Sequence, residues 1–372
     1  MSWLILAGFL LAGLPSLCLG QSAEWVFPGK TWAQKTPEEL GVDRAKLEEF
    51  RRSVGGTGTV IKDGYLIYSW GNPEEAFDWF SAAKPVLSTL LFCAIAEGRV
   101  KSVDDKIVEW GWDLRGKDRG ITFRHLADMT SGYACKEGPG EAYAYNDIAI
   151  NLYGKTLKGV FKAELIDAGA ERLMDPLEFQ DGQIFSPPDY VEGMRVICTT
   201  RDFARIGWLW VNRGRWGDKQ LIPRELFDQH VKADVPSSLP RTRTKKTEAD
   251  DYLGIGSYGV GINQSKEGPG VYGFNWWFNQ SREDPDKLTW PSAPSDTFIA
   301  YGRWGIDVMA MFPSLGLVVA ADTEGTEGAW GRFVTGDPNS PMNRNLGILA
   351  DSVRKPAGGS CGQAPPTTQL GK

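Results

Sequence analysis

The 372-residue sequence predicts an α+β fold, in which an antiparallel sheet is flanked by terminal helices and interrupted by an inserted, mainly helical domain. Three observations predict it. A helix and a hairpin pattern come early, helical patterns fill the middle, and a second hairpin and a helix come late. The economical topology pairs the two hairpins in one sheet and covers that sheet with the terminal helices. A cleft is then expected where the sheet and the inserted domain meet.

The early elements follow from local patterns. Residues 37–53 are amphipathic, and Asp43 is a plausible N-cap for a helix there. In residues 59–69, β-branched residues flank Asp63-Gly64, a dipeptide that favours the left-handed turn of a hairpin. These two segments therefore predict one helix followed by one hairpin.

The late elements come in the opposite order, a hairpin followed by a helix. Residues 309–312 and 317–321 are apolar and flank a Pro-Ser-Leu-Gly turn, which predicts the second hairpin. A last helix is expected near 343–354. We detect no internal repeat.

The resulting domain prediction assigns 21–80 and 201–355 to a discontinuous sheet domain and 81–200 to the helical domain. An apolar run before Gly20-Gln21 predicts a signal peptide over residues 1–20, with a membrane anchor as the alternative. We therefore expect a secreted or periplasmic protein with no membrane span after removal of the signal. Residues 356–372, rich in Gly, Pro and Thr, predict a flexible tail.

Composition excludes several classes of function. Lys and Arg total 41 against 47 Asp and Glu, a net charge of −6 that argues against a nucleic-acid binder. Only two histidines, His125 and His230, argue against a His-rich metal site and against most Ser-His-Asp triads. We expect neither metal nor cofactor, and the sequence makes no prediction of oligomeric state. The four cysteines left after signal removal fit no zinc pattern and allow three disulfide pairings: Cys93, Cys135, Cys198 and Cys361.

The first candidate for chemistry is Ser81-Ala-Ala-Lys84, which precedes an apolar helical pattern. Pro85 is tolerated only in the first turn of a helix, so the helix should begin near Ser81. Residues three apart then share a face, which places the Lys84 amine beside the Ser81 hydroxyl. A neighbouring base is what a serine needs to become a nucleophile. A chance pair on a helix surface is the alternative.

Two further segments strengthen this interpretation. Tyr145-Asn146-Asp147 follows a Gly-rich loop, and a tyrosine can relay a proton to a leaving group. Later in the chain, Arg303 places a permanent cation just before the second hairpin. A loop tyrosine at the edge of the core and a solvated arginine are the alternatives. Tyr143 is a second candidate for the tyrosine role.

With these residues, the chain resembles the superfamily of serine β-lactamases and penicillin-binding proteins, in its class C-like esterase and D-peptidase branch. The Ser-x-x-Lys of that family matches Ser81 and Lys84. Its Tyr-x-Asn corresponds to Tyr145-Asn146-Asp147, with Asp in place of Asn, and its Lys-Thr-Gly motif to Arg303-Trp304-Gly305. The similarity covers about residues 37–355 and implies a β-lactamase/transpeptidase-like fold.

The resemblance implies a role for each residue. Ser81 is the acylated nucleophile, Lys84 takes its proton or tunes Tyr145, and Tyr145 acts as base and then as acid. The oxyanion hole would be formed by the backbone N–H groups of Ser81 and Ile306. Two departures from the motifs matter. Asp147 brings a negative charge that favours protonated Lys84, and Arg303 can bind a carboxylate but cannot shuttle a proton.

Three functions remain open. The first is a secreted serine esterase or amidase acting on a small or carbohydrate-linked acyl substrate, the second a cell-wall D-peptidase or β-lactamase, and the third a catalytically silent binding protein. Four tryptophans favour an aromatic-walled cleft that would suit a sugar-bearing or aromatic ester: Trp276, Trp277, Trp290 and Trp304. Gly358-Gly-Ser-Cys-Gly362 also matches Gly-x-Ser-x-Gly, but it lies in the predicted tail and no histidine follows it.

Overall fold

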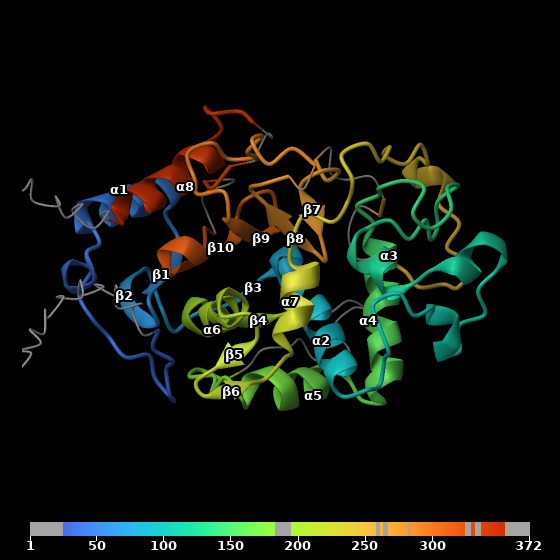
Figure 1. Ribbon diagram of the computed structural model, residues 1–372, viewed down its shortest axis with the longest axis horizontal. Helices are drawn as coiled ribbons and strands as arrows, with labels where there is room; N and C mark the ends of the chain where they lie inside the picture. Colours follow the sequence, from blue (N-terminus) through green and yellow to red (C-terminus); the bar gives the residue numbers. More distant parts are fainter. Residues whose placement is uncertain are drawn as a thin grey trace, which may run out of the picture.

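The computed structural model describes residues 25–182, 195–257, 261–262, 267–281, 283–323, 329–331 and 336–353. The predicted signal peptide, the predicted tail and Cys361 lie outside the described residues. Seven strands form one antiparallel sheet in the order β2-β1-β11-β10-β9-β8-β7 (Figure 1). Their bounds are β1 Thr57–Lys62, β2 Tyr65–Trp70, β7 Tyr272–Gly273, β8 Trp276–Phe278, β9 Phe298–Gly302, β10 Asp307–Phe312 and β11 Leu317–Asp322.

The predicted pairing of the two hairpins is confirmed. β1 lies directly against β11, with Thr57 opposite Asp322 and Lys62 opposite Leu317. The early hairpin turns at Asp63 and Gly64, whose φ angles of 52° and 88° are the left-handed values that this turn requires. Every residue of β1, β10 and β11 is buried, so the centre of the sheet is covered on both faces.

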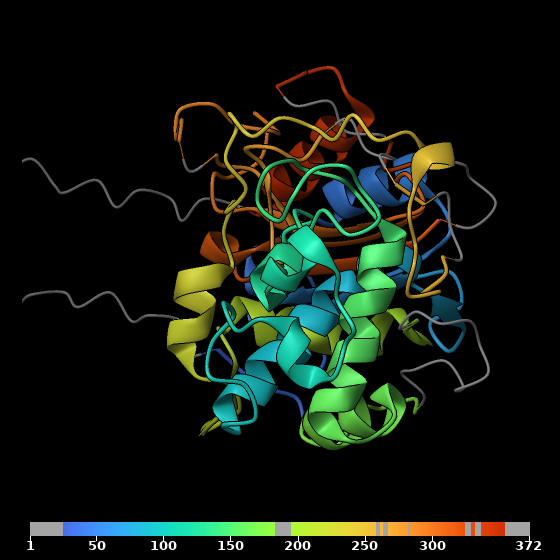
Figure 2. The ribbon, with the colours of Figure 1, turned by 90° about the vertical axis from the view of Figure 1, so that its right-hand side faces the viewer.

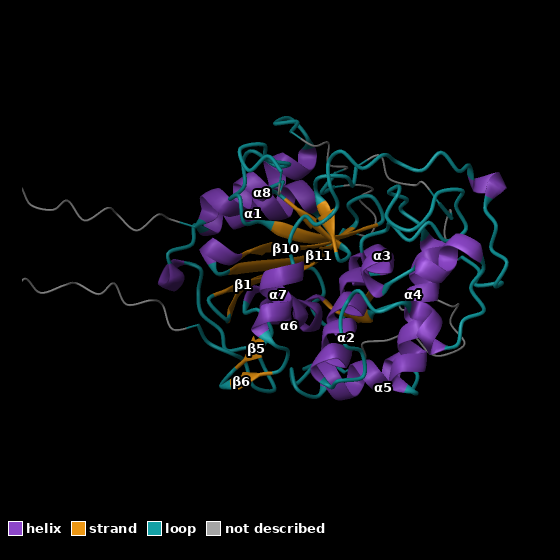
Figure 3. Ribbon diagram, turned by 45° about the vertical axis from the view of Figure 1, so that its right-hand side comes forward, coloured by secondary structure: helices purple, strands orange, loops and turns teal. Residues whose placement is uncertain are grey.

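The terminal helices cover one face of the sheet. Helix α1 (Arg44–Val54) packs beside α8 (Pro341–Ser352), while α6 (Thr200–Val211) covers the other face (Figures 1 and 3). As predicted, Asp43 caps α1, because its side chain accepts a hydrogen bond from the N–H of Ala45 at 2.9 Å.

The helical part lies beside this layered unit (Figure 2). It contains α2 (Lys84–Ala96), α3 (Phe123–Ala127), α4 (Asp147–Phe161) and α5 (Leu165–Gly169), which continues into the π-helix η5 (Ala170–Met174). A later segment returns to it, since Asn151 donates to the carbonyl of Gly256 at 3.0 Å and Lys155 to that of Ile255 at 3.1 Å. Part of the chain after residue 200 therefore also packs against the helical part.

Smaller elements complete the chain. They are β3 (Ala76–Asp78), β4 (Ile197–Thr199), β5 (Arg215–Trp216), β6 (Lys219–Gln220), α7 (Arg224–His230) and the short 3₁₀ helices η1 (Glu38–Leu40), η2 (Phe80–Ala83), η3 (Ile107–Trp110), η4 (Gly116–Gly120), η6 (Lys246–Glu248) and η7 (Pro313–Leu315). Among the described residues, no helix is long and apolar enough to cross a membrane. Within the same residues, Cys93, Cys135 and Cys198 are buried, unpaired thiols.

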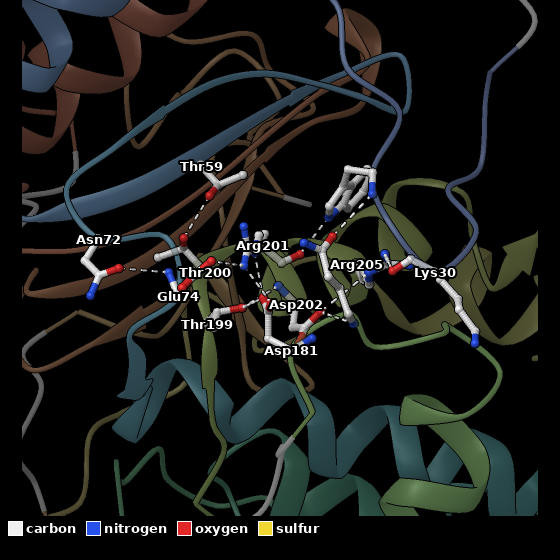
Figure 4. Close-up of polar contacts among 12 residues, drawn as sticks. Lys30, Thr59, Asn72, Glu74, Asp181, Thr199, Thr200, Arg201, Asp202 and Arg205 are labelled. Atoms are coloured by element: carbon white, nitrogen blue, oxygen red, sulfur yellow. Dashed lines mark hydrogen bonds and ion pairs between the residues drawn. The ribbon is translucent and has the colours of Figure 1, made fainter.

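A buried ion pair anchors α6 to its surroundings (Figure 4). Asp202 and Arg205 are both fully buried, with 3.6 Å between Nε and Oδ1. The Asp202 carboxylate accepts two backbone N–H groups, from Gln180 at 2.7 Å and Asp181 at 2.8 Å. Arg205 donates to three backbone carbonyls, those of Gly29, Leu177 and Lys30, at 2.7 to 3.0 Å. This α6 ion pair therefore fastens the N-terminal segment and the end of the helical part to the helix beneath the sheet.

Candidate active site

The predicted nucleophile lies in a 3₁₀ turn at the start of α2. Strand β3 pairs with β4 and leads into Trp79, whose N–H donates to the carbonyl of Val196 at 2.9 Å. The Trp79 ring is fully buried and stacks on Phe203 at 4.1 Å. From this anchor the chain enters η2, which holds Ser81 and continues directly into α2, with Pro85 in its first turn. The prediction that the helix begins near Ser81 is confirmed.

Lys84 lies between Ser81 and Asp147. Its Nζ donates to Ser81 Oγ at 2.6 Å and lies 3.1 Å from Asp147 Oδ1. The side chain is 10% exposed, so this ion pair is largely shielded from solvent. Burial opposes the charge of Lys84, but the Asp147 carboxylate and the Tyr145 phenol outweigh it and raise the pKa of the amine. Lys84 is therefore an ammonium ion at neutral pH.

Tyr145 completes this group of side chains. Lys84 Nζ lies 4.9 Å from the centre of the Tyr145 ring, close enough for a cation–π contact. Lys84 Nζ contacts both the Tyr145 ring and Ser81 Oγ. The distance from the Tyr145 ring centre to Ser81 Oγ therefore cannot exceed the sum of those two distances, 4.9 and 2.6 Å. On its other side, the Tyr145 ring stacks on Trp277 at 6.2 Å with an interplanar angle of 21°. Tyr145 is thus held between the ammonium and a buried indole.

The cap of α4 explains why Tyr145 and Asp147 reach the same lysine. The Asn146 side chain caps the helix by accepting the N–H groups of Ile148 at 3.0 Å and Ala149 at 3.1 Å. Its amide also donates to the carbonyl of Tyr133 at 2.8 Å. The residue in the middle of the motif is therefore a structural cap, and it fixes the direction of the residues on either side.

Tyr143, the alternative to Tyr145, has a different environment. Its hydroxyl is buried without a hydrogen-bond partner among the described residues, and its ring packs against Tyr272 at 5.7 Å. Burial raises the pKa of this phenol well above its ordinary value. Of the two tyrosines, Tyr145 is the one that contacts Lys84.

The third motif differs from expectation. Arg303, Trp304 and Gly305 do not begin a strand; they form the turn between β9 and β10, all with positive φ. Arg303 donates to Asp307 at 2.7 and 2.5 Å and to Asp322 at 2.8 Å, so its charge is balanced within the fold. Gly302 of β9 lies against the nucleophile turn, because an added Cβ there would lie 2.9 Å from the Ala82 nitrogen.

Ile306, whose N–H is predicted to line the oxyanion hole, lies in the same turn. Its N–H donates to the carbonyl of Arg303 at 3.4 Å inside the same turn. A backbone donor that already has an acceptor in its own turn is poorly placed for an oxyanion. Ser81 N–H remains as the expected donor from the predicted pair.

The aromatic-walled cleft is largely a core feature. Trp276 and Trp290 are fully buried and Trp277 is 3% exposed, so these three indoles pack inside the protein. Trp304 differs, since it is 51% exposed on the β9–β10 turn. Only Trp304 of the four remains accessible to a ligand, and the prediction for the other three is wrong.

The two histidines have structural environments. His125 forms a capping box with Thr122 at the start of α3. His230 is 8% exposed and lies 4.8 Å from the Phe274 ring. Burial lowers the pKa of His230 to about 4. The Gly-x-Ser-x-Gly sequence at 358–362 lies outside the described residues.

The sequence analysis did not identify Asp78, Phe80 and Arg195, whose contacts fix the backbone next to Ser81. Phe80 precedes Ser81 with a φ of 43°, and its N–H donates to Asp78 Oδ1 at 3.0 Å. Asp78 also pairs with Arg195, whose Nε lies 2.8 Å from Oδ1. Asp78 and Phe80 are close to Ser81 in sequence, but nothing in the sequence marks a partner more than one hundred residues away.

Comparison with known proteins matches residues 44–333 to the family model described as Beta-lactamase. A penicillin-binding protein homologue from Caulobacter crescentus superposes with a TM-score of 0.56 at 12% identity, covering 84% of this chain and 99% of that one. A beta-lactamase from Mycobacterium bovis gives 0.54 at 17% identity, with 83% and 100% covered. EstCE1, described as a hydrolase with promiscuous acyltransferase activity, gives 0.54 at 14% identity, with 83% and 97% covered.

Proposed function

This chain belongs to the beta-lactamase family, and from that membership we propose that it is a serine hydrolase that cleaves an ester or amide bond through an acyl intermediate on Ser81. The observation that carries the proposal is the 2.6 Å hydrogen bond from Lys84 Nζ to Ser81 Oγ, in a site where Lys84 is also paired with Asp147. We further propose export from the cytosol, on the basis of the apolar run that precedes Gly20.

The proposed chemistry gives each side chain one task. Lys84, held as an ammonium, donates to Ser81 Oγ and stabilises the phenolate form of Tyr145. As Oγ bonds to the substrate carbonyl carbon, the Ser81 proton passes to Tyr145, and the Ser81 N–H donates to the developing oxyanion. Tyr145 then returns this proton to the leaving group as the scissile bond breaks. In deacylation, Tyr145 takes a proton from water as the water oxygen bonds to the acyl carbon, and it returns this proton to Ser81 Oγ as the acyl–serine bond breaks.

Arg303 bears on the choice of substrate. A β-lactam or D-peptide substrate carries a carboxylate, which an unpaired cation near the nucleophile would bind. Asp307 and Asp322 already accept hydrogen bonds from Arg303, so a substrate carboxylate would have to compete with two buried side chains for this guanidinium. This arrangement favours a neutral ester or amide over a penicillin-like substrate.

The test is labelling with a fluorophosphonate probe, followed by turnover of a p-nitrophenyl ester, a p-nitroanilide and nitrocefin. We expect wild-type protein to be labelled and Ser81→Ala to be inert. Ser88→Ala is a matched control, because Ser88 lies on the same helix, is fully buried and donates to Asn275 at 2.9 Å. Nitrocefin turnover faster than ester turnover would favour the β-lactamase alternative. A wild-type serine that does not react would favour a silent binding protein.

A further inference from the structure

Phe80, immediately before the nucleophile, has a backbone conformation that its side chain does not favour. Its φ of 43° lies in the left-handed region, which a bulky residue adopts only with backbone strain. Such a conformation persists only where neighbouring groups enforce it. Here the N–H of Phe80 is bound by Asp78 at 3.0 Å, which fixes the backbone on one side of the residue.

The aromatic ring of Phe80 is fixed by two guanidinium groups. The Cζ atom of Arg195 lies 3.8 Å from the ring centre and that of Arg303 lies 4.4 Å from it. Planar guanidinium groups stack well on aromatic rings, and the contact strengthens when both are withdrawn from water. We call Phe80, Arg195 and Arg303 the arginine clamp.

Each arginine of the clamp is tied to a different part of the fold. Arg195 is bound by Asp78, which is the last residue of β3 and also holds the Phe80 N–H. Arg303 is bound by Asp307 of β10 and Asp322 of β11. Those two carboxylates face each other across the strand pair, so the clamp connects the residue before Ser81 to the centre of the sheet.

We propose that the arginine clamp is a positioning device that holds the Phe80–Ser81 turn in its strained conformation and so keeps Ser81 Oγ within hydrogen-bond distance of Lys84. In this role Arg303 acts through Phe80 and does not contact substrate. The inference rests on the proposed function, since positioning matters only if Ser81 reacts. Misplacement of a reacting atom by about 1 Å can cost roughly 10²-fold in rate.

The test compares Phe80→Leu with Phe80→Tyr. Leucine keeps an apolar side chain but has no aromatic face for the two arginines, whereas tyrosine keeps that face. We expect Phe80→Leu to lower kcat and the fluorophosphonate labelling rate by about 10- to 100-fold, with KM within about twofold, and Phe80→Tyr to restore most of the loss. Arg303→Lys, which keeps a charge for Asp307 and Asp322, should lower kcat in the same way.

The control is a second phenylalanine in contact with two arginines. Phe161, at the end of α4, has Arg172 at 4.5 Å and Arg99 at 5.7 Å from its ring centre. It lies about 20 Å along the helix from Asp147, at 1.5 Å per residue. Phe161→Leu should therefore leave the labelling rate of the folded protein unchanged.

The outcomes separate the two proposals. Folded Phe80→Leu or Arg303→Lys protein that labels at the wild-type rate overturns the clamp and leaves the proposed function in place. A rise in KM with unchanged kcat also overturns the clamp, because it indicates contact with substrate. Wild-type protein that does not label overturns the proposed function and the clamp together.

Discussion

Two buried ion pairs of this protein, one formed by Arg205 and the other by Lys84, have different surroundings. The α6 ion pair, Asp202 and Arg205, is surrounded by backbone N–H and carbonyl groups. Lys84, in contrast, contacts the side chains of Ser81, Asp147 and Tyr145. Both pairs carry the cost of removing charges from water, and each offsets that cost in its own way.

The difference teaches how to tell a structural charge from a chemical one. Backbone amides neither titrate nor form covalent bonds, so they can only hold Arg205 and Asp202 in place. The partners of Lys84 include a hydroxyl and a phenol that can pass a proton between them. We therefore expect mutations at the α6 ion pair to affect stability, and mutations at Lys84 to affect reactivity.

The largest effect is expected from Lys84→Met. Methionine approximates the length of lysine but supplies no hydrogen-bond donor for Ser81, and the labelling rate should fall by about 10³-fold or more. Adding Asp147→Asn removes the carboxylate that the first mutation leaves without its cation. The double variant should regain stability in urea unfolding yet remain unreactive. Recovery of reactivity in the double variant would contradict the chemical role of Lys84.

Arg205→Met should produce a large effect of the opposite kind. It leaves the Asp202 carboxylate buried without its cation, which should lower the free energy of unfolding by about 3–5 kcal/mol. Urea unfolding measures this loss. The fraction that remains folded should label at the wild-type rate per molecule, and a slower rate would show that α6 affects the site.

Asp147→Asn should have a moderate effect that depends on pH. Burial opposes the ammonium of Lys84 and Asp147 supports it, so the mutation should lower the pKa of Lys84. The alkaline limb of the labelling profile should therefore move to lower pH. At a fixed pH on that limb, the labelling rate should fall in proportion to the remaining ammonium form of Lys84, which a profile of rate against pH measures directly.

The same substitution tests the linkage to stability. A raised lysine pKa stabilises the wild-type fold below the ordinary value of 10.5, and this contribution is lost as the pH rises through the folded value. The variant should therefore be less stable than the wild type at neutral pH, and the difference should shrink at strongly alkaline pH. A difference in unfolding free energy that does not change with pH would contradict this assignment.

The smallest effect is expected from Tyr143→Phe. Its buried hydroxyl has no hydrogen-bond partner among the described residues, so removing it should stabilise the protein by about 1 kcal/mol and leave the labelling rate unchanged. Removing the hydroxyl of Tyr145, in Tyr145→Phe, should slow labelling by about 10²-fold or more. Similar rates for the two variants would remove Tyr145 from the proposed mechanism.

The fold was predictable where the signal is local. Asp43 caps its helix and Asp63-Gly64 turns its hairpin as the residue types require. The pairing of β1 with β11 followed from placing two hairpins in one sheet. The extension of that sheet by β7 and β8 was not predicted, because strands of two and three residues carry almost no periodic pattern.

The parts of the candidate site that depend on local sequence were predictable, as in the fold. Helical spacing brought Ser81 to Lys84, and the family motif pointed to Tyr145 and Asp147. The partners of Arg303 were not foreseen, because Asp307 and Asp322 are brought to it by strand pairing, which the local sequence does not reveal. Phe80 was missed because a positive φ at a bulky residue is enforced by distant contacts and has no signature of its own.

The strand order has a consequence for the order of synthesis. β1 leaves the ribosome early, but its neighbour β11 ends at Asp322, more than 250 residues later. Until β11 has been synthesised, Arg303 lacks the full set of aspartate side chains that bind it. The turn that carries Ser81 does not yet have the complete sheet to pack against. In a nascent chain of this protein, Ser81 is therefore expected to reach the arrangement described here only near the end of translation, after the long chain segment between the first and last strands has closed.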